Sequence, residues 1–145
     1  MIEVTHRLDI AAPRQHVFDF LSDPRNDPIW NGEIFETVID DGPVDVGSKF
    51  VSRARFLGMK FDTELVVTEL IRHEVFANRA VSGPVPFEVR WQFSETPGGT
   101  HVDRLSRADV GVFRFAESVV AKMADRGVDA NFRRIKEILE SPPSP

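Results

Sequence analysis

The segment that most restricts the fold is the last long one, residues 115 to about 140, which has the apolar pattern of a helix. At 100° per residue, its apolar stripe consists of Ala116, Val119, Val120, Met123 and Gly127. Charged residues fall on the opposite side. A helix with one apolar face must bury that face against another element, and the chain before it looks like strands. We therefore expect one curved sheet that grips this C-terminal helix.

Gly127 is an unusual residue for the middle of a helix. Glycine there costs roughly 1 kcal/mol relative to alanine, so a structural reason for it is expected. Three explanations remain open: close approach of the sheet backbone, a bend in the helix, or space left for a cavity. Ala124 and Asn131 on neighbouring turns are also small or polar, which favours the cavity. If the glycine keeps a tunnel open, Gly127→Leu should block ligand binding and leave the fold intact. If the glycine allows close helix–sheet contact instead, the same substitution should destabilise the fold by ~1–3 kcal/mol.

Alternation of apolar and polar residues predicts seven strands upstream of this helix. The expected ranges are 2–10, 33–40, 48–57, 60–71, 74–81, 87–94 and 100–110. Two short helices are expected after the first strand, at residues 13–22 and from the Ser22-Asp23-Pro24 cap to Trp30. Long strands joined by short turns predict an antiparallel sheet with one wet face, and the α+β class.

Length and composition indicate one domain, over residues 1–140, followed by a proline-rich tail at 141–145 that is expected to be disordered. The net charge of −5 argues against nucleic acid and anionic membranes as partners, because both need clustered cations. No window approaches the ~20 apolar residues of a membrane span, and no signal-peptide run is visible. The absence of cysteine fits a reducing compartment. We expect a cytoplasmic protein that is a monomer or a homodimer.

Several short segments carry a family resemblance: IAAP (10–13), VFDFLSDP (17–24), WN (30–31), GSKF (47–50), VTE (67–69) and GT (99–100). Over essentially its whole length the chain resembles the polyketide cyclase/dehydrase branch of the START-like (SRPBCC) superfamily, which includes a major pollen allergen and lipid-transfer domains. The resemblance implies a helix-grip fold, a seven-stranded antiparallel sheet around the C-terminal helix with a hydrophobic tunnel between them. Members bind sterols, lipids, polyketides or hormones, and some cyclise aromatic polyketides. They share no catalytic motif.

Strand and helix periodicity selects the side chains that point toward the expected tunnel. The predicted lining is His6, Phe50, Ser52, Ala54, Phe56, Thr63, Leu65, Phe87, Val89, Trp91, Arg104 and Ser106 from the strands, with Ala116, Val120, Met123, Gly127 and Asn131 from the helix. The large rings either fill a core or line a pocket, and the sequence leaves both open for any single ring. Small residues between them, such as Ser52 and Ala54, favour a mostly apolar cavity.

Three polar residues interrupt this face: His6, Arg104 and Asn131. In a helix-grip fold the first and last strands are antiparallel neighbours, so His6 and Arg104 are expected to lie near each other. A buried cation without a partner costs several kcal/mol. Arg104 is therefore either part of a structural pair, or turned into solvent by a shift in register, or a polar anchor for a ligand inside an apolar tunnel.

Motifs of established chemistry are missing. The four histidines have no spacing that suggests a shared metal, so we expect no metal site, and no nucleotide or flavin fingerprint suggests a cofactor. Whether the protein is an enzyme stays open. The leading hypothesis is a carrier or sensor for a small hydrophobic molecule such as a lipid, polyketide or isoprenoid. The alternatives are a polyketide cyclase or dehydratase that uses His6 and Arg104, and a protein-interaction domain.

Overall fold

The computed structural model describes residues 2–56, 58–109 and 117–141. Its elements in chain order are β1 (Ile2–Ile10), α1 (Arg14–Leu21), the 3-10 turn η1 (Pro24–Asn26), α2 (Asp27–Trp30), β2 (Ile34–Ile39), β3 (Lys49–Phe56), β4 (Met59–Ile71), β5 (Val75–Ser82), β6 (Phe87–Thr96), β7 (Gly99–Ala108) and α3 (Glu117–Glu140). The predicted start of the last helix and most of the predicted tail lie outside the described residues.

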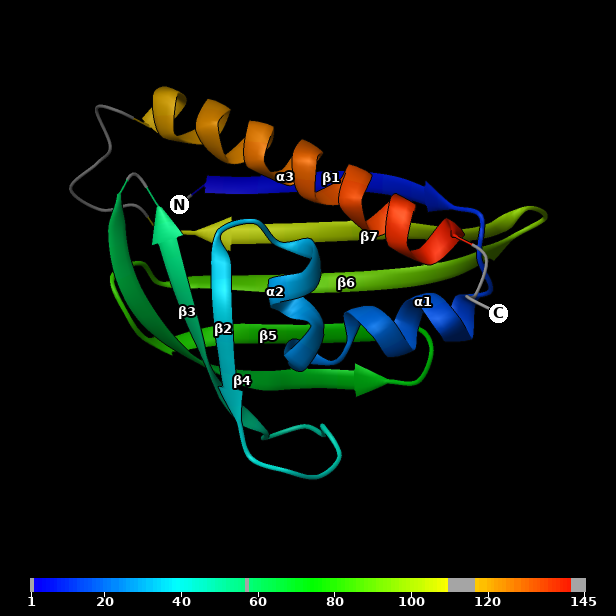
Figure 1. Cartoon of the computed structure of the whole chain (residues 1–145), viewed down its shortest axis with the longest axis horizontal. Helices are drawn as coiled ribbons and strands as arrows, with labels where there is room; N and C mark the ends of the chain where they lie inside the picture. Colours follow the sequence, from blue (N-terminus) through cyan, green and yellow to red (C-terminus); the bar gives the residue numbers. More distant parts are fainter. Residues whose placement is uncertain (1, 57, 110–116, 142–145) are drawn as a thin grey trace.

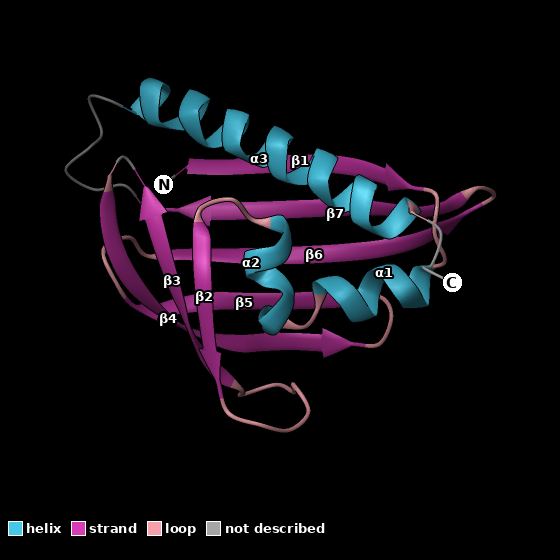
Figure 2. Ribbon diagram, viewed as in Figure 1, coloured by secondary structure: helices cyan, strands magenta, loops and turns pink. Residues whose placement is uncertain are grey.

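The strands form one antiparallel sheet of seven, in the order β1-β7-β6-β5-β4-β3-β2. Figure 1 shows that the sheet curves strongly and that α1, α2 and α3 all lie on the same side of it. The helices and strands are distinguished by colour in Figure 2, in which α3 runs along the β1 and β7 end of the sheet. This is the helix-grip arrangement that the resemblance implied, so the predicted fold class is confirmed.

Most element boundaries agree with the sequence pattern to within one or two residues, and β1 agrees at both ends. The second short helix differs from the prediction because it is divided into the turn η1 and the single turn α2. Pro24 is the first residue of η1 and Pro28 is the second residue of α2, which are positions where a helix does not need the N–H that proline lacks. Asp23 caps the first piece by accepting a hydrogen bond from the Arg25 amide, at 3.0 Å.

The corner between β1 and α1 is held against the start of β7. The side chain of Thr100 is fully buried and donates a hydrogen bond to the carbonyl oxygen of Ala12, at 2.8 Å. Gly99 has a φ of +153° and lies directly against the backbone of Ile10 and Ala12. Only a residue without a side chain fits there, because a Cβ atom would overlap the Ile10 carbonyl oxygen.

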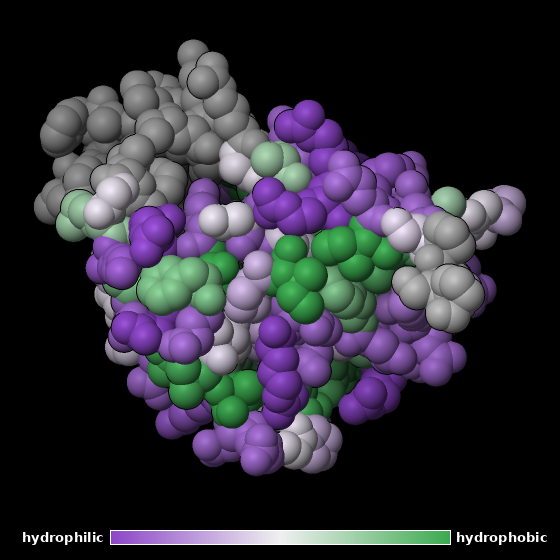
Figure 3. Space-filling view, viewed as in Figure 1, coloured by the Kyte–Doolittle hydropathy of each residue, from purple (hydrophilic) through white to green (hydrophobic). Residues whose placement is uncertain are grey.

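The hydrophobic core lies between the sheet and the three helices. Phe18 on α1 is fully buried and packs edge to face against Phe93 on β6, with ring centroids 5.2 Å apart. Ile135 and Leu139 bury the end of α3 in the same cluster. Figure 3 shows apolar residues (green) gathered along the junction of α3 with α1 and α2, within a largely polar surface. None of the described helices is both long and apolar enough to cross a membrane.

Candidate ligand-binding cavity

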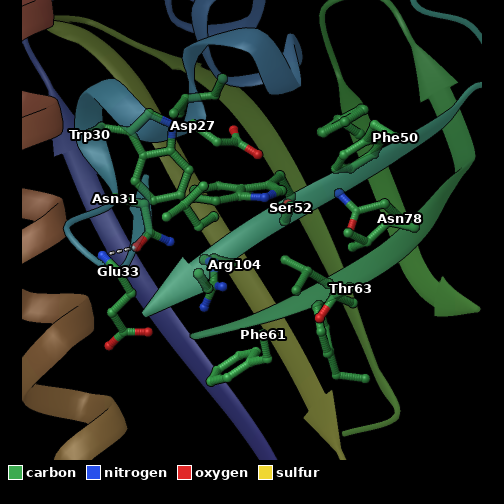
Figure 4. Close-up of a pocket in the computed structure, with 18 residues that line it drawn as sticks. Asp27, Trp30, Asn31, Glu33, Phe50, Ser52, Phe61, Thr63, Asn78 and Arg104 are labelled. Carbon is green, nitrogen blue, oxygen red and sulfur yellow. Dashed lines mark hydrogen bonds between the residues drawn. The ribbon is translucent and has the colours of Figure 1, made fainter. Parts of the chain in front are cut away.

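A cavity of about 210 Å³ lies between the concave face of the sheet and the helices α1 and α2. It is lined by Leu21, Asp27, Trp30, Asn31, Glu33, Ile34, Phe50, Ser52, Ala54, Phe61, Thr63, Leu65, Phe76, Asn78, Phe87, Val89, Trp91 and Arg104. Inward side chains of β3 to β7 make up most of the wall, because alternate residues of a strand point to the same face. Figure 4 shows the ten labelled residues around the central space.

Nine of the residues predicted from the sequence lie in this lining. They are Phe50, Ser52, Ala54, Thr63, Leu65, Phe87, Val89, Trp91 and Arg104. Ser52 and Thr63 face each other across the β3–β4 ladder, and Asn78 on β5 joins them on the same side of the cavity (Figure 4). The wall is thus apolar over most of its area, and the side chains of Ser52, Thr63 and Asn78 form a small polar cluster on one side of it.

Four other predicted residues are described by the structure but lie outside the lining: His6, Ser106, Gly127 and Asn131. His6 is opposite Arg104 in the β1–β7 ladder, as the fold predicted, but its ring packs edge to face on Phe132 of α3, with centroids 5.9 Å apart. The side chains of Phe56, Ala116, Val120 and Met123, which were also predicted to line the cavity, lie outside the described residues.

Arg104 supplies the positive charge of the cavity. Its guanidinium carbon lies 5.2 Å from the centroid of the Trp91 ring, and its Nη1 atom donates a hydrogen bond to the Ser106 hydroxyl oxygen at 2.7 Å. Its Nε atom is buried and has no hydrogen-bond partner among the described residues. Burial lowers the pKa of the Arg104 guanidinium to about 10, while the carboxyl groups of Asp27 and Glu33 act in the opposite direction.

Two acidic side chains, Asp27 and Glu33, share this end of the cavity. Burial, with a smaller contribution from the nearby Asp23, raises the pKa of Asp27 to about 8. The indole N–H of Trp30 and the Arg104 charge act against this rise, although the indole does not reach hydrogen-bond geometry with any described group. Asp27 therefore keeps its proton near neutral pH. Burial also raises the pKa of Glu33.

Of the nine cavity residues that the sequence did not predict, four belong to α2 and the loop after it. Asp27 is the first residue of α2 and Trp30 the last, so the two lie about one turn apart on the same side of the helix. A tryptophan in a short helix usually packs inward, so that spacing was a signal that Asp27 points inward too. Asn78 shares a face with the buried Phe76 two residues earlier, which also marked it as inward.

Asn131 and Arg134 connect α3 to the loop after α2 instead of lining the cavity. The Asn131 side-chain oxygen accepts a hydrogen bond from the Gly32 amide at 3.0 Å, and Arg134 donates one to the Trp30 carbonyl oxygen at 2.9 Å. The polar position that the sequence suggested as a ligand contact is thus used to fix the loop that carries Trp30, Asn31 and Glu33 into the cavity wall.

Gly127 has a different neighbour from those predicted. Apart from its chain neighbours and the backbone of its own helix, only the Glu33 carboxylate among the described atoms lies within 4 Å of a Cβ atom placed there, at 3.0 Å, so no described sheet backbone approaches it. Figure 4 shows the Glu33 carboxylate directed toward α3. The glycine makes room for this carboxylate.

Gly127→Ala is expected to stabilise the protein by up to ~1 kcal/mol, because alanine is the better helix former and the end of Glu33 is free to turn aside. Chemical denaturation measures the change. In a Glu33→Ala background the gain should be at least as large, and a smaller gain there would contradict the account.

Metal binding has no support in the described part of the chain, where no group of three or more histidine or acidic side chains is arranged to hold an ion. The cavity offers instead one guanidinium, one carboxyl group that is protonated near neutral pH, and hydroxyl and amide groups at the other end. Such groups bind and polarise oxygen atoms of an organic molecule.

Comparison with known proteins gives one family and a set of related folds. Residues 1–140 match the family described as "Polyketide cyclase / dehydrase and lipid transport". The crystal structure of TTHA0849 from Thermus thermophilus is similar with a TM-score of 0.83 and 17% identity, over 99% of this chain and 100% of that one. Ara h 8.0201 has a TM-score of 0.74 and 11% identity, over 97% and 99% of the two chains.

A third similar structure is the di-domain ARO/CYC StfQ from the steffimycin biosynthetic pathway, with a TM-score of 0.79 and 14% identity. The match covers 96% of this chain and 50% of StfQ. At these identities the likeness shows the fold alone. No curated protein sequence matches the chain.

Proposed function

Because the chain belongs to the polyketide cyclase / dehydrase and lipid transport family, we propose that it binds a small, mostly apolar molecule in the cavity between its sheet and helices, as a carrier or a sensor. The observation that carries the proposal is the cavity itself. Aromatic and aliphatic side chains surround a space of about 210 Å³ that ends in a few convergent polar groups. This is the usual make-up of a small-molecule site.

The size of the cavity limits the ligand. Sites for drug-sized ligands have volumes of roughly 300–1,000 Å³, so this smaller space suits a molecule with on the order of ten non-hydrogen atoms. The described residues around the cavity leave less space than a long acyl chain or a sterol needs. The ligand proposed is therefore a compact ring compound rather than a full-length lipid.

A variant that fills the cavity tests this proposal. Ala54→Leu places a larger side chain in the lining of β3 and is expected to weaken binding of small aromatic probes by at least about tenfold while the fold stays intact. Probe binding is measured by isothermal titration calorimetry, and folding by thermal melting.

Val51→Leu is the matched control, because Val51 lies on the other face of the same strand. It should bind the probes as the wild-type protein does. Equal binding by wild type and Ala54→Leu would place the ligand outside this cavity and contradict the proposal.

A second candidate function is catalysis of ring closure or dehydration. It is favoured by one observation, the Asp27 carboxyl group in the same cavity as the Arg104 guanidinium. Burial raises the pKa of this carboxyl group to about 8, and a proton donor with a pKa near the working pH suits general acid catalysis. His6, the acid first considered from the sequence, lies outside the cavity lining. Incubation with a short poly-β-ketone thioester separates the two functions: an enzyme forms a cyclised or dehydrated product, whereas a carrier returns the compound unchanged.

A further inference from the structure

Arg104 is a half-buried cation in the cavity wall that the described protein neutralises incompletely. No carboxylate among the described residues forms an ion pair with it, and its direct partners are a ring face of Trp91 and the hydroxyl of Ser106. Taking a cation out of water costs several kcal/mol unless charge and hydrogen bonds compensate for it. A neutral hydroxyl and a ring face supply only part of that compensation.

The two nearby acidic groups, Asp27 and Glu33, do not complete the compensation of the Arg104 charge. Figure 4 shows that the Glu33 carboxylate is directed toward α3, where it faces Gly127. Asp27 keeps its proton near neutral pH, because burial raises its pKa to about 8. In that state Asp27 contributes a hydrogen-bond donor rather than a negative charge.

Several N–H donors of Arg104, which lines the cavity, make no hydrogen bond to the described protein. A guanidinium has five N–H donors, of which one reaches Ser106. The buried Nε atom has no partner among the described residues, and the side chain lines the cavity (Figure 4). The Nη2 atom is not among the buried atoms, so an oxygen atom with negative charge in the cavity can accept from the Nη donors and compensate for the charge, while Nε stays covered by protein.

We propose that the ligand of this cavity carries an oxyanion, a carboxylate or a phenolate, which binds Arg104 while the apolar body lies against the aromatic wall. This inference rests on the proposed function, since it names the chemical class of the ligand. A cationic ligand is repelled at this end. A neutral ligand leaves the guanidinium charge uncompensated.

The test compares three probes of nearly equal shape: trans-cinnamate, trans-cinnamamide and trans-β-methylstyrene. Calorimetry at pH 6, where the first probe is anionic, is expected to show cinnamate binding to the wild-type protein at least about tenfold more tightly than the amide. In Arg104→Met this preference should vanish, while the affinities for the two neutral probes stay within about twofold of wild type.

Arg107→Met is the matched control. Arg107 is on the same strand but on the outer face, where it pairs with Glu3 at 2.8 Å and Glu88 at 3.4 Å. This variant should keep the wild-type preference for cinnamate.

The outcomes separate the two proposals. Equal binding of cinnamate and cinnamamide by the wild-type protein, or a preference that survives in Arg104→Met, overturns the oxyanion inference and leaves the proposed function standing. Binding of none of the three probes overturns the proposed function and the inference with it. The comparison of probes in the wild-type protein needs no variant, so the inference remains testable even if Arg104→Met does not fold.

Discussion

Gly99→Ala is expected to destabilise the protein by more than ~3 kcal/mol, because the added Cβ atom meets backbone on two sides. It would overlap the carbonyl oxygen of Ile10 and lie 2.9 Å from the amide nitrogen of Ala12. These are backbone atoms at the fixed corner between β1 and α1, and they have no rotamer by which to move aside. The φ of +153° adds strain for any residue other than glycine. Denaturant unfolding followed by circular dichroism measures the loss.

The neighbouring glycine provides the control. A Cβ atom on Gly98 has no heavy atom within 4 Å, so Gly98→Ala should change the free energy of unfolding by less than ~1 kcal/mol. The two substitutions add the same methyl group to adjacent residues of one turn. Similar stabilities for the two variants would contradict the close approach described at Gly99.

Asp27→Asn is expected to change how stability depends on pH. Burial raises the pKa of Asp27 from its ordinary value of 3.8 to about 8 in the folded protein. Between these values the folded state holds a proton that the unfolded state has released, so the wild-type protein loses stability as the pH rises from about 4 to about 8. Asparagine has no proton to lose, and the variant lacks this decline.

The expected size of the effect is on the order of 2–5 kcal/mol. By this amount the free energy of unfolding of Asp27→Asn, relative to that of the wild type, should increase between pH 4 and pH 9. The pKa of about 8 already includes the attraction between ionised Asp27 and Arg104, which offsets part of the burial cost. Urea denaturation at a series of pH values gives the two curves.

Asp41→Asn, in the exposed turn after β2, is the control. Its curve of unfolding free energy against pH should run parallel to that of the wild type. If the Asp27→Asn curve is also parallel to wild type, Asp27 is ionised in the folded protein at neutral pH and the account of its environment is wrong.

The fold was predictable because it depends on local periodicity. The alternation of Ile2 to Ile10 predicts β1 at both ends, and the resemblance supplies the order of strands that makes His6 and Arg104 neighbours. The division of the second helix into η1 and α2 was harder to predict. Its cause is the spacing of Pro24 and Pro28, which leaves each piece about one turn long and too short for an apolar period to appear.

The cavity was predictable only where strands form it. Alternation places Phe50, Ser52 and Ala54 on one face of β3, and all three lie in the lining. The spacing to Trp30 indicates which way Asp27 points, but its burial in a cavity depends on the way α2 is held over the sheet, through the hydrogen bonds of Asn131 and Arg134. Those contacts join residues far apart in the chain, and no local pattern encodes them. For the same reason the sequence suggested that Gly127 lines the cavity, whereas it lies behind the lining residue Glu33.

The cavity wall also determines the optical properties of the protein. The chain has two tryptophans and no tyrosine, and both indoles, Trp30 and Trp91, line the cavity with their ring centroids 5.7 Å apart and nearly perpendicular. Ultraviolet fluorescence therefore comes almost entirely from this wall, since phenylalanine emits weakly. A molecule entering the cavity changes the polarity around both emitters at once, whereas events on the outer face of the sheet do not. Occupancy can thus be followed without a label, from the emission of the native chain alone.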